Sequence, residues 1–374
     1  MLETVIQQAL NALQLGSYYS LIALGYCLVY GVLLLINFAH GDIFMVGAYI
    51  AFFAATFIMG QHAFIPANVS PLAQIACTGF FAIILTASAA YIIGRVTREG
   101  FRQTRAFKLL IGGLFVLFSL LVYFLGKGFV LPKGADRWVV MGATVPLTML
   151  LTAAVGIFIE RVAYRPLRQK GANRLYVVIT ALMMGIILEY GNLSALGASR
   201  IPFPPLIKTA IFEIAGVTVT NLKLISIGVA FAVFGLLQWI VTRTKLGMAM
   251  RAVSYDKFAV PLMGIPLDII IVFTFFLGSS MAGLAGMLYA MNFPVLDPFM
   301  GALVGWKAFV AAVVGGIGDI RGAFVGGFLL AILEIVVAAV FSSELRDLIS
   351  FTILLGILTM KPTGLFGTAK TTKI

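Results

Sequence analysis

The chain has 374 residues, of which 61% are hydrophobic and only 11% are charged. This composition excludes an ordinary soluble globular domain and indicates a protein that lies in a membrane. The formal net charge of +12 does not point to nucleic acid. In a membrane protein, Lys and Arg are expected to concentrate in cytoplasmic loops and to contact acidic lipid heads.

Apolar runs that approach the roughly 20 residues needed to cross a bilayer predict an all-α, polytopic membrane protein. In chain order, the predicted spans are residues 15–36, 43–65, 72–94, 107–125, 138–159, 175–197, 224–242, 269–291, 323–341 and 345–360. Residues 303–317 include Lys307 and would rise only about 22 Å as a helix, so we expect a short, tilted or re-entrant element there. The total is about 9 to 11 transmembrane or re-entrant helices.

The distribution of basic residues predicts the orientation. If the short helix also crosses and the N-terminus lies outside, 18 of the 26 Lys and Arg residues fall on the inner side. An excess of basic residues in inner loops is the general rule for helical membrane proteins. We therefore expect the N-terminus outside and the C-terminus in the cytoplasm.

The chain is predicted to be one membrane domain, residues 1–374, because no linker or low-complexity tract divides it. Two segments resemble each other: NFAHGDIFM, from Asn37, and NFPVLDPFM, from Asn292. The predicted topology places them on opposite sides of the membrane, as an inverted repeat would. Chance similarity in a biased composition is the alternative.

The sequence lacks the ingredients of an enzyme. Its two histidines, His40 and His62, are far apart and are not part of a zinc-binding pattern. It also lacks the G-x-x-x-x-G-K-[ST] loop that holds nucleotide phosphates. We expect this chain to bind no metal or cofactor and to draw any energy of ATP hydrolysis from a partner.

Four motifs occur along the chain in a characteristic order. They are GSYYSLIALGYCLVYGVLLLINFAHGD near the start, ERVAYRPLR at 160–168, KLGMAMRAVSYDKFAVPLMGI at 245–265 and KAFVAAVVGGIGDIRGAFVGG at 307–327. Together they resemble the Liv-type branched-chain amino acid permeases of ATP-binding-cassette (ABC) importers. One glycine-rich motif alone would be weak, but the four cover nearly the whole chain.

The resemblance implies a multi-pass subunit of the bacterial inner membrane that moves branched-chain or related neutral amino acids inward by alternating access. It also implies a second, related permease subunit, two cytoplasmic ATPase subunits that bind ATP and Mg²⁺, and a periplasmic substrate-binding protein. A urea or short-amide permease of the same family would share these motifs. A proton- or ion-coupled carrier is the alternative from a different class, because Glu189 lies within a predicted span.

The resemblance identifies residues 245–265 as the cytoplasmic coupling segment. Gly247 and Gly264 are expected at its bends, and Arg251, Tyr255 and Asp256 are expected to contact an ATPase. Met248, Met250, Val253 and Val260 would face the membrane surface, and an amphipathic interfacial helix is the alternative.

The chain departs from the family pattern in two places. Residues 95–145 contain an unusual insertion that would add about two spans. In the coupling segment, Tyr255 stands where an acid is frequent, and Pro261 is predicted to kink or end the helix near Val260.

Polar residues interrupt the apolar sequence at Asn37, His40, Gly41 and Asp42. One interpretation is an inner turn, with a tight bend at Gly41 and Asp42 capping the next helix. The other is an interrupted helix that lines the substrate pathway. Glu189 would either bond to a neighbouring helix or contact the amino group of the substrate.

Glycines recur in two further patterns. Gly278, Ala282 and Gly286, and likewise Gly318, Gly322 and Gly326, are spaced for close helix packing. The glycines Gly315, Gly316, Gly318 and Gly322 also permit a sharp re-entrant turn, in which Asp319 and Arg321 would form a local pair.

Overall fold

The computed structural model describes residues 2–59, 116, 136–214 and 216–367. The predicted spans at 72–94 and 107–125, and most of the 95–145 insertion, lie outside these residues. The chain divides into two compact units, one of Met1–Phe52 with Val145–Ile374 and one of Phe53–Thr144. In the second unit, the described residues are mainly the end of one helix, α2, and the start of another, α6. The sites described below lie in the first unit.

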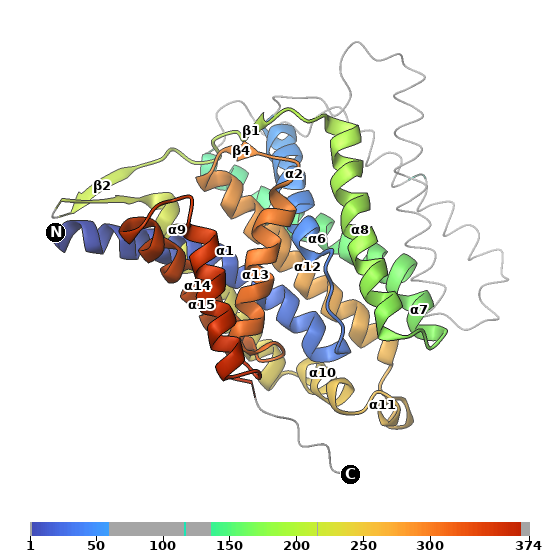
Figure 1. Ribbon diagram of the computed structural model, residues 1–374. Coiled ribbons are helices and arrows are strands. Elements are labelled where there is room, and N and C mark those ends of the chain that lie inside the picture. Colours follow the sequence, from blue (N-terminus) through green and yellow to red (C-terminus); the bar gives the residue numbers. More distant parts are fainter. Residues whose placement is uncertain (1, 60–115, 117–135, 215, 368–374) are drawn as a thin grey trace. The chain divides into compact units, whose positions relative to one another are not determined.

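The described chain is almost entirely helical (Figure 1). Its helices are α1 (Leu2–Leu33), α2 (His40–Ile58), α6 (Arg137–Ile159), the π-helix η1 (Glu160–Tyr164), α7 (Arg165–Gln169), α8 (Arg174–Leu196), α9 (Asn221–Arg243), α10 (Lys245–Tyr255), α11 (Ala259–Leu262), α12 (Leu267–Asn292), α13 (Met300–Gly316), α14 (Ile320–Val340) and α15 (Arg346–Met360). Strand β1 (Ile201–Pro202) pairs with β4 (Val295–Leu296), and β2 (Ile211–Ile214) pairs with β3 (Val217–Thr220), both antiparallel.

Within the described residues, seven helices are long and apolar enough to cross a membrane. They are α1, α2, the continuous rod of α6, η1 and α7, and the helices α8, α9, α12 and α14. This confirms the predicted polytopic helical fold. The anomalous segment is the 17-residue helix α13, which begins three residues before its predicted start.

Helix α1 begins at Leu2, although the apolar pattern predicted a start at residue 15. The earlier turns carry polar side chains that have partners elsewhere in the fold. The Gln7 side chain bonds to the backbone N–H and carbonyl of Thr218 in β3, and Asn11 accepts a hydrogen bond from Lys223 at 2.7 Å. A helix stabilised by such distant contacts gives no apolar signal in the sequence.

Helix α1 is the centre of the first unit. It packs against α9, α12, α13 and α14, and 83% of its most apolar window is buried. In α8 and α9 only 17% of the corresponding window is buried. These outer helices therefore present apolar faces to lipid or to another protein.

Small residues let the central helices approach closely, as their spacing predicted. A Cβ at Gly278 would meet Gly25 of α1, and a Cβ at Gly286 would collide with the backbone of α2 at Phe44 and Ala48. A Cβ at Gly326 would collide with the backbone of α13 at Ala311. These contacts are between backbones, which cannot turn aside as a side chain can.

Replacing Gly286 by Ala is expected to lower the midpoint of thermal unfolding in detergent, because the added methyl group overlaps the backbone of α2. Overpacking of this kind costs about 1–3 kcal/mol. Gly228→Ala is the matched control, since nothing lies within 4 Å of a Cβ at that helical position. Equal midpoints for the two variants would contradict the packing described.

Candidate functional site

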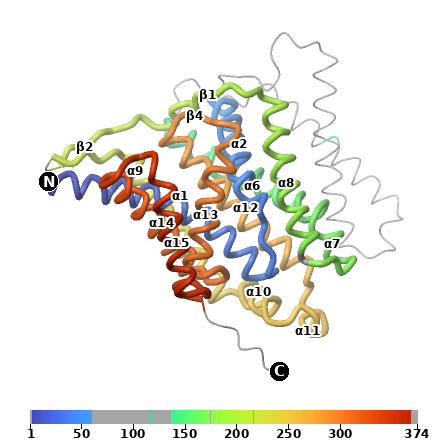
Figure 2. The backbone as a smooth tube through the Cα atoms, in the orientation of Figure 1, coloured from blue at the N-terminus to red at the C-terminus, as the bar shows by residue number. Residues whose placement is uncertain are grey.

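The chain leaves helical conformation at residues 34–39, the linker between α1 and α2, which contains the start of the INFAHGD stretch (36–42). Leu34 has a φ of +54°, the only positive value among the described residues other than glycine. Figure 2 shows the chain turning at the end of α1 and rising as an open stretch to the start of α2. The bend expected at Gly41 is therefore wrong, because the chain turns earlier, at Leu34 and again at residues 38–39, before α2 begins.

Gly41 lies in the first turn of α2, where it allows close contact with α13. A Cβ at Gly41 would lie 2.6 Å from the carbonyl oxygen of Gly301 and 2.8 Å from the Cα of Gly305. Asp42 also lies in this first turn, past the cap position that was expected for it. The stretch thus serves as a contact between helices.

Asn37 and His40 point into the helix bundle. The Tyr164 hydroxyl donates a hydrogen bond of 2.6 Å to Asn37 Oδ1, which ties the linker to η1. The His40 ring is 1% exposed and packs edge-on against Tyr26, with ring centroids 4.7 Å apart. It lies over Gly25, where any side chain would overlap the ring. Asn37 and His40 are thus both engaged in contacts that hold the linker and the start of α2 against neighbouring helices.

Asp42 is enclosed by glycines of two other helices. A Cβ at Gly185 of α8 would collide with Asp42 Oδ2, and a Cβ at Gly301 of α13 would lie 2.8 Å from Oδ1. The Asp42 residue is only 8% exposed. Its Oδ1 has no hydrogen-bond partner in the part of the chain that the structure describes. A buried, incompletely bonded carboxylate is costly in a membrane protein.

A cavity of about 120 Å³ lies beside this carboxylate. Its polar wall carries two acids, Asp42 and Glu189, beside the glycines of the α2–α13 contact. Its apolar wall is formed by the aromatic residues Tyr26, Phe38 and Trp306 and the aliphatic residues Leu182 and Ile186. The cavity can therefore receive a cation that carries an apolar body.

The structure brings together three of the five predicted pathway residues. Gly41, Asp42 and Glu189 line the cavity, although Glu189 is more than 140 residues from the other two. Asn37 lies instead beside a second, much smaller cavity with Tyr164. His40 lines neither of these two cavities.

The coupling segment forms two short helices, α10 and α11. Arg251, Tyr255 and Asp256 are exposed, as expected, and Tyr255 is 94% exposed. Helix α10 ends at Tyr255, so the predicted end near Val260 is wrong. Asp256 has an extended backbone, and its carboxylate accepts hydrogen bonds from the N–H groups of Phe258 and Ala259.

The apolar residues of the segment divide differently from the prediction. Met250, Val253 and Val260 are buried against the rest of the protein, whereas Met248 is exposed. Gly264 has a φ of +77° and forms the bend after α11, as expected. Gly247 is buried, and a Cβ there would collide with the carbonyl groups at the end of α9.

Hydrogen bonds join the coupling segment to the membrane helices. The Arg251 guanidinium donates to the carbonyl of Val241 near the end of α9. The Lys257 ammonium donates to the carbonyl of Leu33, the last residue of α1. Lys257 therefore bonds to the chain directly before the turn at Leu34.

The ERVAYRPLR motif continues α6 through the π-helix η1. Glu160 is fully buried and contacts Arg168 at 3.0 Å, and Arg168 contacts Asp268 of α12 at the same distance. Arg165 also pairs with Asp268. Single π-helical turns often mark functional sites. This one is connected to α12 by Glu160 through Arg168 and to the linker by Tyr164.

The glycine-rich motif at 307–327 makes the expected sharp turn between α13 and α14. Gly316 and Gly318 have φ values of +112° and +102°. The Asp319 carboxylate accepts hydrogen bonds from the backbone N–H groups of Arg321 and Gly322 and so caps the start of α14. Asp319 and Arg321 are therefore paired, as expected, but the contact is made by the backbone of Arg321.

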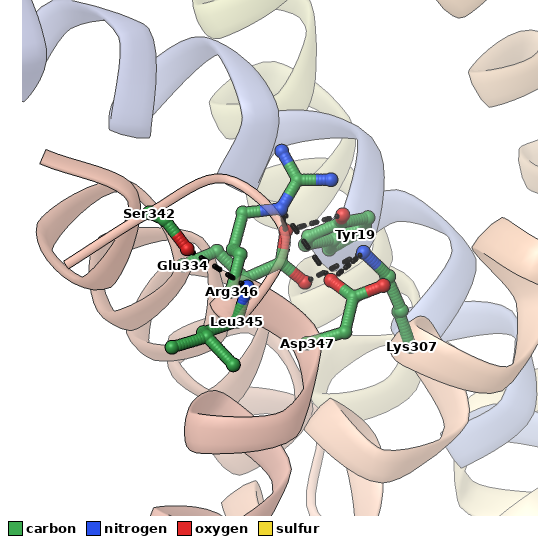
Figure 3. Close-up of polar contacts among 7 residues, drawn as sticks. All are labelled: Tyr19, Lys307, Glu334, Ser342, Leu345, Arg346 and Asp347. Carbon is green, nitrogen blue, oxygen red and sulfur yellow. Dashed lines mark hydrogen bonds and ion pairs between the residues drawn. The ribbon is translucent and has the colours of Figure 1, made fainter.

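An ion network around the buried residues Lys307 and Glu334, which the sequence did not reveal, lies among four helices (Figure 3). Lys307 of α13 contacts Asp347 at 2.6 Å and Glu334 at 3.2 Å. The Tyr19 hydroxyl of α1 donates to Glu334 at 3.0 Å, and Arg346 of α15 lies 3.7 Å from the same carboxylate. Two cations and two anions thus balance each other. The network explains how Lys307 is tolerated in an apolar helix.

The arrangement offers polar contacts and a cavity. Within the ranges that the structure describes, no group of His, Cys, Asp or Glu residues could hold a metal ion. The candidate site therefore consists of the cavity beside Asp42 and the coupling segment, which the linker connects.

The profile of the family described as "Branched-chain amino acid transport system / permease component" matches residues 108–358. The chain belongs to this family. It is similar to the high-affinity branched-chain amino acid transport system permease protein BraD of Pseudomonas aeruginosa, with 33% identity over 99% of this chain and 98% of that protein. The corresponding protein LivH of Escherichia coli is 31% identical, over 99% of this chain and 97% of LivH. No solved structure matches the chain significantly.

Replacing Glu334 by Gln is expected to lower thermal stability strongly, because it leaves Lys307 and Arg346 with one carboxylate between them. Breaking a buried ion pair typically costs about 3–5 kcal/mol. The midpoint of unfolding in detergent measures the effect. Asp297→Asn is the matched control, because its pair with Arg200 lies near the surface and should be worth about 0–1 kcal/mol. Similar losses in both variants would contradict the role given to the network.

Proposed function

We propose that the chain is the transmembrane permease subunit of an ABC importer that moves branched-chain amino acids into the cytoplasm by alternating access. The observation that carries this proposal is the full-length similarity to BraD and LivH, which the family match supports. The names of these relatives favour amino acids over urea or short amides. The acids and apolar walls of the cavity suit an amino acid with an aliphatic side chain.

The proposed location is the bacterial inner membrane, with the N-terminus outside and the C-terminus in the cytoplasm. In Figure 1, α7, α10 and α11 lie at one end of the first unit and β1 and β4 at the other. The basic residues Arg168, Lys245 and Arg251 belong to the end that carries α10. The excess of positive charge there supports a cytoplasmic position for that end.

The coupling segment is the proposed docking surface for the ATPase subunits, which would bind ATP and Mg²⁺. Phe258 and Leu262 are 91% and 89% exposed, and Tyr255 and Met263 continue the same segment. Large apolar side chains so fully exposed beside charged groups are typical of an interaction site. A second permease and a periplasmic binding protein would complete the importer.

The hydrogen bonds of the segment suggest how ATPase motion reaches the pathway. Lys257 holds the carbonyl of Leu33, and Tyr164 holds the side chain of Asn37. The linker between these two contacts leads directly to Asp42 at the cavity. We infer that a shift of α10 and α11 moves the linker and so changes access to the cavity.

Reconstitution tests this function. Vesicles that contain the chain with its ATPase, second permease and binding protein are expected to accumulate labelled leucine only when ATP is supplied to the ATPases. Vesicles with the chain alone should not accumulate leucine under a proton or sodium gradient. Gradient-driven uptake by the isolated chain would instead identify a secondary carrier. Uptake of urea in preference to leucine would correct the substrate.

Replacing Phe258 by Asp is expected to reduce retention of the ATPase subunits at least tenfold during purification, because a charge would enter an apolar contact. Phe212→Asp, on the exposed strand β2, is the matched control and should retain them. Quantitative gel analysis of the purified complex measures the ratio. Full retention by the Phe258 variant would remove this surface from the interface.

A further inference from the structure

We propose that the cavity between α2, α8 and α13 binds the ammonium group of the transported amino acid, with Asp42 as its counter-ion. This rests on the proposed function and adds the chemistry of one binding station to it. The ligand class is a primary ammonium that carries an aliphatic body.

The first reason is that Asp42 is buried beside the cavity without a full set of hydrogen bonds. The residue is 8% exposed and lines the cavity, and its Oδ1 has no hydrogen-bond partner among the described residues. Gly185 and Gly301 hold the carboxylate in place, because a side chain at either position would meet it. A fixed, buried carboxylate that lacks a donor and lines the cavity leaves an uncompensated negative charge at its wall, which favours a cationic donor that arrives from the cavity.

The walls of the cavity select the kind of donor. Glu189 adds a second acid, so a ligand with only a carboxylate would be repelled. Phe38 and Trp306 lie with ring centroids 5.5 Å apart, and aromatic faces attract ammonium groups. Leu182 and Ile186 provide an apolar surface on α8 for the carbon atoms of the ligand.

The size of the cavity limits what it can recognise. Its volume is about 120 Å³, somewhat less than the roughly 150 Å³ of a cavity known to enclose benzene. The ammonium group and a few neighbouring atoms would fit, but a whole leucine molecule would not be enclosed. The station should therefore require the amine strictly and discriminate weakly among side chains.

Trp306 lines the cavity and provides a direct probe. The full-length chain would be purified with 5-fluorotryptophan in its three Trp positions. The ¹⁹F signal of Trp306 would be assigned with Trp306→Phe and followed during titration. The ligands are leucine, 3-methylbutylamine, which lacks the carboxylate, and 4-methylpentanoate, which lacks the amine.

Leucine and 3-methylbutylamine are expected to shift the Trp306 signal, and 4-methylpentanoate is expected to leave it unchanged. Asp42→Asn should weaken binding of the amine about tenfold or more, because it removes the charge from the hydrogen bond. Glu189→Gln, at a half-buried position, should weaken it severalfold and guards against a folding defect in the first variant. Glu213→Gln, on the exposed strand β2, is the control and should bind as the unchanged chain does.

The proposal is overturned if neither amine shifts Trp306, if 4-methylpentanoate shifts it equally, or if both acid variants bind as the control does. These results are independent of the transport assay. ATP-dependent leucine uptake without amine binding would keep the proposed function and remove this site. Amine binding together with gradient-driven uptake would keep the site and remove the importer.

Discussion

Every charge and free backbone group in the apolar core of a membrane needs a partner from the protein, and the structure is organised by this constraint. The network of Lys307, Glu334, Arg346 and Asp347 is its clearest expression, since four charges from three helices compensate one another beside α1. Tyr19 adds a hydrogen bond from α1 itself. Asp42 is different. Glu334 and Glu160 each lie beside a basic side chain, whereas Asp42 has no ion pair among the described residues and its Oδ1 has no hydrogen-bond partner there. The missing cation is what distinguishes this candidate binding group from the structural acids.

Glycines make possible both the close packing of the helices and the cavity beside Asp42. The close approach of α2 and α13 depends on Gly41, Gly301 and Gly305, which leave room for neither a side chain nor a lipid tail between the helices. The same glycines form the polar wall of the cavity beside Asp42. Close packing and an open site are thus produced by the same residues. A larger side chain at these positions would affect both.

Most of the helices were predictable from the sequence, because apolar length is the signal that a membrane helix must carry. The described spans agree with the prediction within a few residues, apart from the start of α1 and the end of α2, which lies at Ile58 and not at residue 65. That start depends on contacts of Gln7 and Asn11 with residues more than 200 positions away. The turn at Leu34 was missed for a related reason, since a leucine with positive φ is held by its surroundings and has no local sequence signal.

The candidate site was predictable in its members but not in its geometry. Asp42 and Glu189 each stood out as an acid near or within an apolar run, and the structure places both at one cavity. Glu334 carries the same signal, an acid within a predicted span, but the sequence did not reveal its role, because its partners Lys307 and Tyr19 come from other helices. Single-sequence patterns report the cost of burying a charge. They do not report which distant residue compensates it.

The linker at residues 34–39 connects these features mechanically. A regular helix from α1 to α2 would be stiff, and it would satisfy its own backbone groups with no role for other elements. The break at Leu34 instead leaves the chain held by Lys257 from the coupling segment and by Tyr164 from η1. Tyr164 belongs to the segment that contacts Asp268 at the start of α12, so the second contact also depends on the helix that follows α11. One of the contacts that position the linker therefore comes from the coupling segment itself, and the other depends on α12, the helix that follows this segment. Asp42 lies in the first turn of α2, just after the linker.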